Sequence, residues 1–308
     1  TKSWLGKTKK HKALNNITFS LYPGEILGLV GESGCGKSTL AKTVVCLDIP
    51  DSGEISWRGL KIDPKDKKQV AKLRKEVQFI FQDPHAALHP LKTVGSCILE
   101  VLNLHYSNNM KKNHERTISL LNNVGLREEF IHRYSHELSG GQRQRVIIAR
   151  ALAVDPKVLI CDESVAALDI SVQAQVLNLL NDLKNNLGLS YLFISHDLSV
   201  VRHISDMVKV MYLGVIVEEG PTADIFAKSC HPYTQALISA IPIPDPDRRK
   251  NYKEQVIRGE LPNAIEPPKG CPYVSRCTIA ESQCASKRPP LVEIDPNHFI
   301  RCHVRSRH

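Results

Sequence analysis

The segment that most constrains this chain is Gly31-Glu-Ser-Gly-Cys-Gly-Lys-Ser38, a glycine-rich loop ending in a lysine and a hydroxyl. It matches G-x-x-x-x-G-K-[ST] at every position, directly after a predicted strand at 25–30 and before a helical pattern at 38–45. Glycines let the backbone curl so that successive N–H groups point at phosphate oxygens. The helix that follows adds the positive end of its dipole. The sequence therefore predicts a strand, a phosphate-binding loop and a helix, in that order.

Lys37 is expected to reach the β- and γ-phosphates of a nucleotide, and Ser38 to ligate the Mg²⁺ that accompanies it. The candidate nucleotide-binding residues of the loop are Ser33, Gly34, Cys35, Gly36, Lys37, Ser38 and Thr39.

A second element is the apolar run 158–161, which ends in Asp162 and is followed by Glu163. Carboxylates at the C-terminal end of a parallel strand lie at the edge of the sheet where ligands bind. We expect Asp162 to hold the magnesium shell and Glu163 to polarise a water for in-line attack on the γ-phosphate.

Apolar strands and amphipathic helices alternate up to residue 230. The runs 157–161 and 191–194 have the length of buried strands. Between them, over 171–187, apolar residues recur at helical spacing, and Gly188 stands where a C-terminal cap belongs. Strands separated by crossover helices predict an α/β fold with a mainly parallel sheet covered on both faces.

A second glycine-containing motif, Leu138-Ser-Gly-Gly-Gln-Arg-Gln-Arg145, indicates which class of phosphate-loop protein this is. It resembles the signature sequence of ATP-binding cassette (ABC) ATPases. Gln82 resembles that family's Q-loop, the segment 166–169 its D-loop, and His196 its switch histidine, and the order of all motifs matches. The resemblance implies a phosphate-loop ATPase with a RecA-like core, an antiparallel β subdomain and an α-helical signature subdomain at about 83–155.

In this family two cassettes pack head to tail around two ATP molecules. The resemblance implies that the signature residues contact the ATP held by the partner cassette, so that catalysis requires a dimer. These residues are Ser139, Gly140, Gly141 and Gln142. Gln82 would link magnesium to the surface that contacts a membrane partner, and His196 would touch the γ-phosphate. Trp4 is the candidate for stacking on adenine, with His11 as the alternative.

Composition changes near residue 231, because 11 of the 18 prolines lie from there to the end. Proline blocks helix and sheet interiors, which predicts a loop-rich tail. The phrase His231-Pro-Tyr-Thr-Gln-Ala-Leu237, followed by this tail, resembles the C-terminal region of the ATPase subunits of oligopeptide, dipeptide and nickel importers. We therefore expect an ABC ATPase domain at 1–230 and a small Pro- and Cys-rich region at 231–308.

Four of the nine cysteines crowd this tail, namely Cys271, Cys277, Cys284 and Cys302. The pattern resembles that of the subgroup, in which some relatives carry a [4Fe–4S] cluster, and four thiolates are the ligand set of such a cluster. Zinc would accept the same sulfurs. The spacings fit neither a zinc ribbon nor a simple ferredoxin run, so a [4Fe–4S] cluster is expected from the resemblance, with zinc or four free thiols as alternatives.

The formal net charge of +9 admits nucleic acid, an anionic lipid surface or a phosphate-rich ligand, or only solubility. No uninterrupted apolar stretch of about 18 residues occurs, so a channel must lie in other chains. The expected function is an ATP-hydrolysing subunit that powers uptake of peptides, nickel or metal chelates. Its expected partners are a second, paralogous ATPase subunit, two transmembrane permease subunits and an extracytoplasmic substrate-binding protein. The expected location is peripheral, on the cytoplasmic face of the inner membrane.

Two alternatives remain open. A cassette ATPase acting on nucleic acid would explain the excess of positive charge. Such proteins, however, place a long coiled coil between phosphate loop and signature, whereas in this chain only about 100 residues separate the two motifs. A cassette of iron–sulfur assembly would explain the cysteines but not the importer-like tail. We expect no nucleic acid partner. The cargo stays open, because peptide, nickel and metal-chelate importers would use nearly the same cassette.

Overall fold

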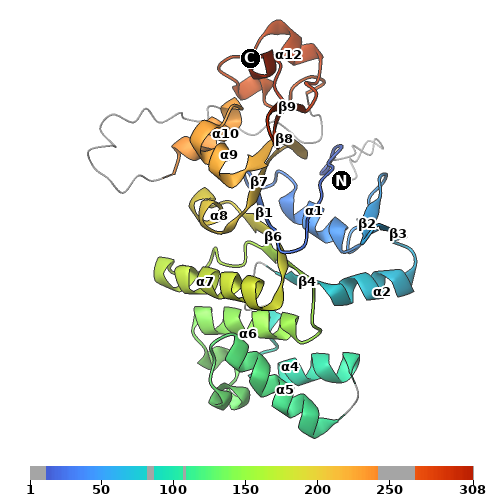
Figure 1. The fold of residues 1–308 in the computed structure, drawn as a ribbon, viewed down its shortest axis with the longest axis vertical. Coiled ribbons are helices and arrows are strands. Elements are labelled where there is room, and N and C mark those ends of the chain that lie inside the picture. Colours follow the sequence, from blue (N-terminus) through green and yellow to red (C-terminus); the bar gives the residue numbers. More distant parts are fainter. Residues whose placement is uncertain (1–11, 82–86, 107–108, 242–267, 308) are drawn as a thin grey trace, which may run out of the picture. The chain divides into compact units, whose positions relative to one another are not determined.

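The computed structural model describes residues 12–81, 87–106, 109–241 and 268–307 (Figure 1). The chain divides into two compact units. The first takes in residues 1–20, 27–40 and 195–308, and the second 21–26 and 41–194. No helix among the described residues is long and apolar enough to cross a membrane.

The second unit contains three parallel strands in the order β4 (Val77–Ile80), β5 (Val158–Asp162) and β6 (Ser190–Ser195). Every residue of β5 and β6 is buried, as expected for parallel strands covered on both faces. A separate antiparallel hairpin joins β2 (Ile55–Trp57) to β3 (Leu60–Ile62). The helices are α2 (Lys67–Glu76), α4 (Val94–His105), α5 (Met110–Asn123), α6 (Gly140–Leu152) and α7 (Ile170–Leu187), with 3-10 turns at Glu128–His132 and Ser135–Glu137.

Helix α7 follows the predicted pattern closely. Its buried residues are Val176, Leu177, Leu179, Leu180 and Leu183. Gly188 caps its C-terminus in the left-handed conformation, with φ 63°, and its N–H donates to the carbonyl of Lys184. The prediction of a helix over 171–187 is therefore confirmed, and it extends by one residue at the N-terminus.

The first unit contains the strands β1 (Ile26–Val30), β7 (Met207–Tyr212), β8 (Val215–Pro221), β10 (His298–Ile300) and β9 (Val292–Asp295), in that spatial order. Strands β1 and β7 are parallel, and the later pairings are antiparallel. Its helices are α1 (Lys37–Val44), α8 (Leu198–Ile204), α9 (Thr222–Lys228), α10 (Pro232–Ser239) and α12 (Ser282–Ser286), with 3-10 turns at Val274–Arg276 and Arg305–Arg307. The first residue of β1 and the second half of α1 fall in the other unit, and the last residue of β6, Ser195, falls in this one.

The C-terminal tail contributes to this sheet. Phe299 of β10 pairs with Glu219 of β8, and β9 pairs with β10. The expectation of a loop-rich tail is thus wrong for residues 292–300, where a short hairpin lies free of proline except at its turn.

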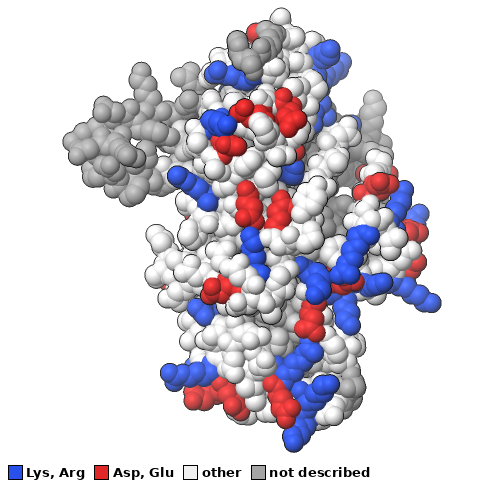
Figure 2. Space-filling model, in the orientation of Figure 1, with Lys and Arg blue, Asp and Glu red and all other residues white. Residues whose placement is uncertain are grey.

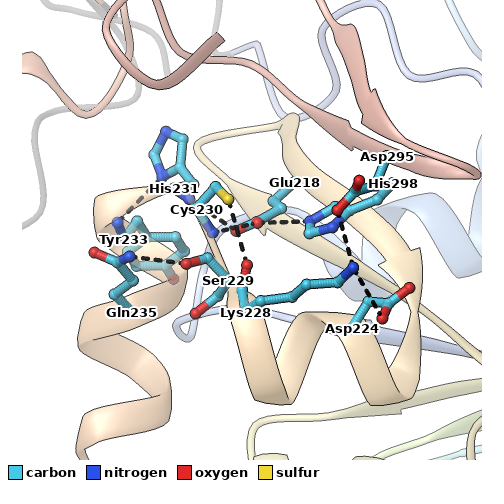
Figure 3. Close-up of polar contacts among 10 residues, drawn as sticks. All are labelled: Glu218, Asp224, Lys228, Ser229, Cys230, His231, Tyr233, Gln235, Asp295 and His298. Carbon is cyan, nitrogen blue, oxygen red and sulfur yellow. Dashed lines mark hydrogen bonds and ion pairs between the residues drawn. The ribbon is translucent and has the colours of Figure 1, made fainter. Parts of the chain in front are cut away.

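A buried carboxylate links this hairpin to the segment before α10 (Figure 3). The side chain of Glu218, on β8, is fully buried and accepts hydrogen bonds from the backbone N–H of Cys230 at 2.7 Å and of His231 at 3.1 Å. Its Oε1 lies 2.9 Å from Nε2 of His298 on β10, which is also fully buried. One carboxylate therefore ties together β8, β10 and the start of α10.

His231 caps the N-terminus of α10, because its Nδ1 accepts from the N–H of Tyr233 at 3.1 Å. Burial lowers the pKa of His231 from 6.5 to about 4, although the charge of Glu218 opposes that shift. The folded protein thus holds this imidazole neutral, whereas the unfolded chain protonates it below pH 6.5.

The free energy of unfolding should consequently fall as the pH drops from 6.5 towards 4, with about 3 kcal/mol due to His231 over that interval. We expect His231→Asn, which retains a helix-capping acceptor but does not titrate, to remove this contribution. Urea unfolding at pH 7 and pH 5 measures it: the wild type should lose about 2 kcal/mol more than the variant. Equal losses in both proteins would contradict the assignment.

Basic side chains gather over α2 in the face drawn in Figure 2, whereas Lys and Arg are mixed with Asp and Glu elsewhere on that face. The exposed basic residues of α2 are Lys67, Lys68, Lys72 and Arg74. On this face, α2 is one of the places where positive charge gathers.

Candidate functional site

The predicted phosphate loop joins β1 to α1 in the first unit, and its glycines are required by close backbone contacts. Gly31 has φ 153°, and a Cβ there would lie 2.2 Å from the carbonyl oxygen of Met211. Gly36 has φ 110°, and a Cβ there would lie 2.4 Å from the carbonyl oxygen of Ala13. Any side chain at either position would push the loop away from its neighbours, so the tight curl depends on glycine.

Lys37 lies inside this curl. Its side chain is nearly fully buried, with the residue 5 % exposed. Its Nζ donates to the carbonyl oxygens of Gly31 at 2.7 Å and of Glu32 at 3.0 Å. The ammonium group and the N-terminus of α1 thereby bring positive charge to the concave side of the loop.

The other predicted loop residues fall into two groups. Ser33 and Gly34 are exposed at the tip, and Gly34 needs glycine only for its φ of 77°. Cys35 is buried, which raises the pKa of its thiol, while Ser38 and Thr39 are half-buried in the first turn of α1. His196 follows β6 as an exposed residue of the first unit.

The acidic pair lies in the second unit, at the end of β5. Asp162 is 5 % exposed, and Glu163 is half-buried with φ 48°, a left-handed conformation that non-glycine residues seldom adopt. The N–H of Glu163 donates to the carbonyl of Ile194 at 3.0 Å, and its own carbonyl accepts from Ala166 at 3.1 Å. These bonds stabilise a tight turn directly after the strand, and strain of this kind is common at functional sites.

The signature segment forms the N-terminus of α6. The hydroxyl of Ser139 accepts from the N–H of Gln142 at 3.3 Å, and the Gln142 side chain accepts from the N–H of Ser139 at 3.0 Å. This reciprocal capping box defines the start of the helix. A Cβ on Gly141 would lie 2.3 Å from Cγ1 of Val172, so glycine lets α6 pack closely against α7. Gly140 is half-buried beside it, and Asp169 precedes α7.

Three predicted residues, Trp4, His11 and Gln82, lie outside the described residues. Of the remainder, the structure places the loop 31–38 and His196 in the first unit, and Asp162, Glu163 and the signature in the second.

The cysteine-rich region brings its four thiols near one another. Cys271, Cys284 and Cys302 are buried and Cys277 is half-buried. Burial, together with smaller contributions from the other three thiols, raises the pKa of Cys271 to about 11. Within the described ranges, no group of three or more His, Cys, Asp or Glu side chains is arranged to hold a metal ion. The expectation of a [4Fe–4S] cluster, or of zinc, therefore has no support from the described residues.

Two further residues that the motif search missed contact the phosphate loop. The hydroxyl of Tyr233, on α10, accepts from the N–H of Glu32 at 2.8 Å. Arg276 donates to the carboxylate of Glu32 at 2.9 Å. Tyr233 lies in the phrase that resembles the importer subgroup, but no local signal in the sequence connects either residue to a loop some 200 positions earlier.

Comparison with known proteins agrees with this arrangement. Residues 14–166 match the ABC transporter family model, and residues 217–284 match the model of the oligopeptide/dipeptide transporter C-terminal region. The oligopeptide transport ATP-binding protein OppF of Haemophilus influenzae is 46% identical over 300 residues, which cover 97% of this chain and 90% of that protein. The dipeptide transport ATP-binding protein DppF of the same organism is 47% identical over 302 residues, covering 98% and 91%.

Solved structures show the same fold. The ABC transporter subunit CbiO1 of Clostridium perfringens superposes with a TM-score of 0.65 at 31% identity, covering 70% of this chain and 84% of that one. The ATP-binding cassette MJ0796, in a dimeric post-hydrolysis state with ADP and phosphate, gives 0.61 at 31% identity, covering 68% and 90%. The phosphate loop, the acidic strand end, the signature helix and these similarities together show that the chain is an ATPase of the ABC transporter family, in the group with the oligopeptide/dipeptide transporter C-terminal region.

Proposed function

We propose that this ATPase powers the uptake of peptides through a membrane transporter. The observation that carries the proposal is the match of residues 217–284 to the oligopeptide/dipeptide transporter C-terminal region, together with relatives named for oligopeptide and dipeptide transport. The nucleic acid and iron–sulfur assembly alternatives are not favoured, since relatives covering nearly the whole chain are transport subunits.

The proposed roles follow the motifs of the sequence. Ser33, Gly34, Cys35, Gly36, Lys37, Ser38 and Thr39 bind the phosphates of ATP, and Ser38, Gln82 and Asp162 surround the Mg²⁺ that arrives with it. Glu163 polarises the attacking water, and His196 contacts the γ-phosphate. Trp4 stacks on adenine. The buried ammonium of Lys37 and the buried carboxylate of Asp162 support these roles.

The signature residues act in a second copy of the site. Ser139, Gly140, Gly141 and Gln142 contact ATP held by another cassette, since a capped helix N-terminus is suited to an anion. That cassette is a paralogous chain. The complete transporter adds two transmembrane permease subunits and an extracytoplasmic substrate-binding protein, with this chain on the cytoplasmic face of the inner membrane. Residues 1–230, with a helical subdomain at about 83–155, form the ATPase domain, and 231–308 the C-terminal region.

Lys37→Ala should weaken ATP binding about 10- to 100-fold, the usual size of a lost hydrogen bond to a charged group. The reason is that the ammonium is the only side-chain cation inside the loop 31–38. Titration of the purified chain with a fluorescent ATP analogue measures the dissociation constant. Lys42→Ala, which removes an exposed lysine from the last turn of α1, serves as the matched control and should bind like the wild type.

Uptake by the host organism tests the cargo. We would replace the gene with the Lys37→Ala form and measure accumulation of a radiolabelled tripeptide and of radiolabelled nickel. Loss of tripeptide uptake with normal nickel uptake supports the proposal. Loss of nickel uptake alone would assign the same ATPase to a metal importer, and normal uptake of both would overturn an import role for this chain.

A further inference from the structure

The loop residue Glu32 has a hydrogen-bond partner at its N–H, its carbonyl and its carboxylate, and two of these three partners come from the C-terminal part of the chain. The N–H of Glu32 donates to the hydroxyl of Tyr233 at 2.8 Å. Its carbonyl accepts from Nζ of Lys37 at 3.0 Å. Its carboxylate accepts from Arg276 at 2.9 Å. All four residues belong to the first unit, so these contacts lie within one compact body.

The ion pair between Arg276 and Glu32 is shielded from water. The side chain of Arg276 is 7% exposed and that of Glu32 is 18% exposed. Charges that are partly withdrawn from water interact more strongly and are screened less by salt than surface pairs. This pair therefore differs from the exposed ion pairs of the protein, such as that between Lys61 and Glu54.

An aromatic cluster fixes the position of the arginine. Arg276 also donates to the hydroxyl of Tyr212 at 3.4 Å. The rings of Tyr212, Tyr233 and Tyr273 pack against one another with centroids 4.7 to 5.3 Å apart. Tyr233 and Tyr273 both lie after β8 in the chain, and Tyr273 is three residues before Arg276. The packing of these rings holds Tyr212, the ring that Arg276 contacts, beside the loop residue's partner.

The charge of Glu32 matters because it is the only acidic residue of the loop 31–38. A free carboxylate beside the phosphates of ATP would repel them. We propose that Arg276 is a positioning residue for nucleotide binding, which neutralises Glu32 and holds its carboxylate against the C-terminal region. This inference rests on the proposed role of the loop in binding ATP. By this inference, a residue of the C-terminal region sets the charge of the phosphate loop.

The test compares four variants of the full chain by titration with a fluorescent, non-hydrolysed ATP analogue in Mg²⁺ buffer. Arg276→Gln keeps a hydrogen-bonding side chain but leaves the charge of Glu32 unneutralised. The dissociation constant should rise about tenfold, the order of one uncompensated charge at an effective dielectric constant of about 20. Glu32→Gln combined with Arg276→Gln removes both charges and should restore affinity to within about twofold. Arg305→Gln removes an exposed arginine of the same region and should bind like the wild type.

Restored affinity in the double variant would show that Arg276→Gln weakens binding through charge and not through lost packing, because Glu32→Gln restores no packing at residue 276. Wild-type affinity in Arg276→Gln, or a double variant that binds as weakly as Arg276→Gln, would overturn the inference. Lys37→Ala is the fourth variant. If it loses affinity while Arg276→Gln does not, the inference alone fails; if Lys37→Ala also binds normally, the proposed role of the loop fails.

Discussion

Replacing Glu163 by Gln should lower the rate of ATP hydrolysis about 10²- to 10⁴-fold while leaving ATP binding intact, since a general base contributes that much to a rate. The amide has the shape of the carboxylate but cannot attract a proton from water. The backbone turn that holds residue 163, with φ 48° and a hydrogen bond to Ile194, is kept. Phosphate release in a single turnover, measured beside the dissociation constant for ATP, separates the two effects.

The matched control for this experiment is Asp182→Asn, which removes an exposed carboxylate from α7 in the same unit. It should hydrolyse ATP at the wild-type rate. Wild-type turnover in Glu163→Gln would contradict the assignment of this residue as the group that polarises water. Loss of binding together with turnover would instead indicate that residue 163 holds the nucleotide.

Glu218→Ala should destabilise the first unit by about 3–5 kcal/mol, because it leaves several hydrogen-bond donors without an acceptor and each such buried group costs about 1–3 kcal/mol. The substitution leaves the buried N–H of Cys230, the N–H of His231 and the Nε2 of His298 without their acceptor. Urea unfolding measures the free energy. The backbone amides of β10 should exchange their hydrogens faster, because the contact between Glu218 on β8 and His298 on β10 is lost (Figure 3).

Asp224→Ala is the control for this second experiment. Asp224 pairs with Lys228 at 3.5 Å on the surface, where an ion pair is worth about 0–1 kcal/mol. If Glu218→Ala unfolds at the same urea concentration as Asp224→Ala, the buried carboxylate does not stabilise the attachment of the C-terminal hairpin.

The elements that the sequence predicted are those with a strong local signal. The strand, glycine loop and helix around residues 26–44 depend on neighbouring residues, and so does the capped helix α7. The β9–β10 hairpin was missed because its strands are three and four residues long and follow a proline-rich stretch. Its place beside β8 depends on a pairing about 80 residues apart, which no local pattern encodes.

The candidate site divides in the same way. Lys37, Glu163 and the signature Ser139 could be named as candidates because short motifs specify both the residue types and the backbone turns that hold them. Arg276 and Tyr233 were missed, since their contact with the loop arises only when the chain folds. The expected [4Fe–4S] cluster rested on the resemblance to the importer subgroup, and it has no support from the arrangement of the described residues.

The ion pair between Glu32 and Arg276 joins positions 244 residues apart. We therefore expect positions 32 and 276 to evolve together, because a change at one of them alters which residues are tolerated at the other. Recombination between paralogues that exchanged only the C-terminal region would separate the two partners whenever the parents differ at either position. A chimaera should therefore take the ATPase domain and the C-terminal region from the same parent, so that residues 32 and 276 remain a matched pair.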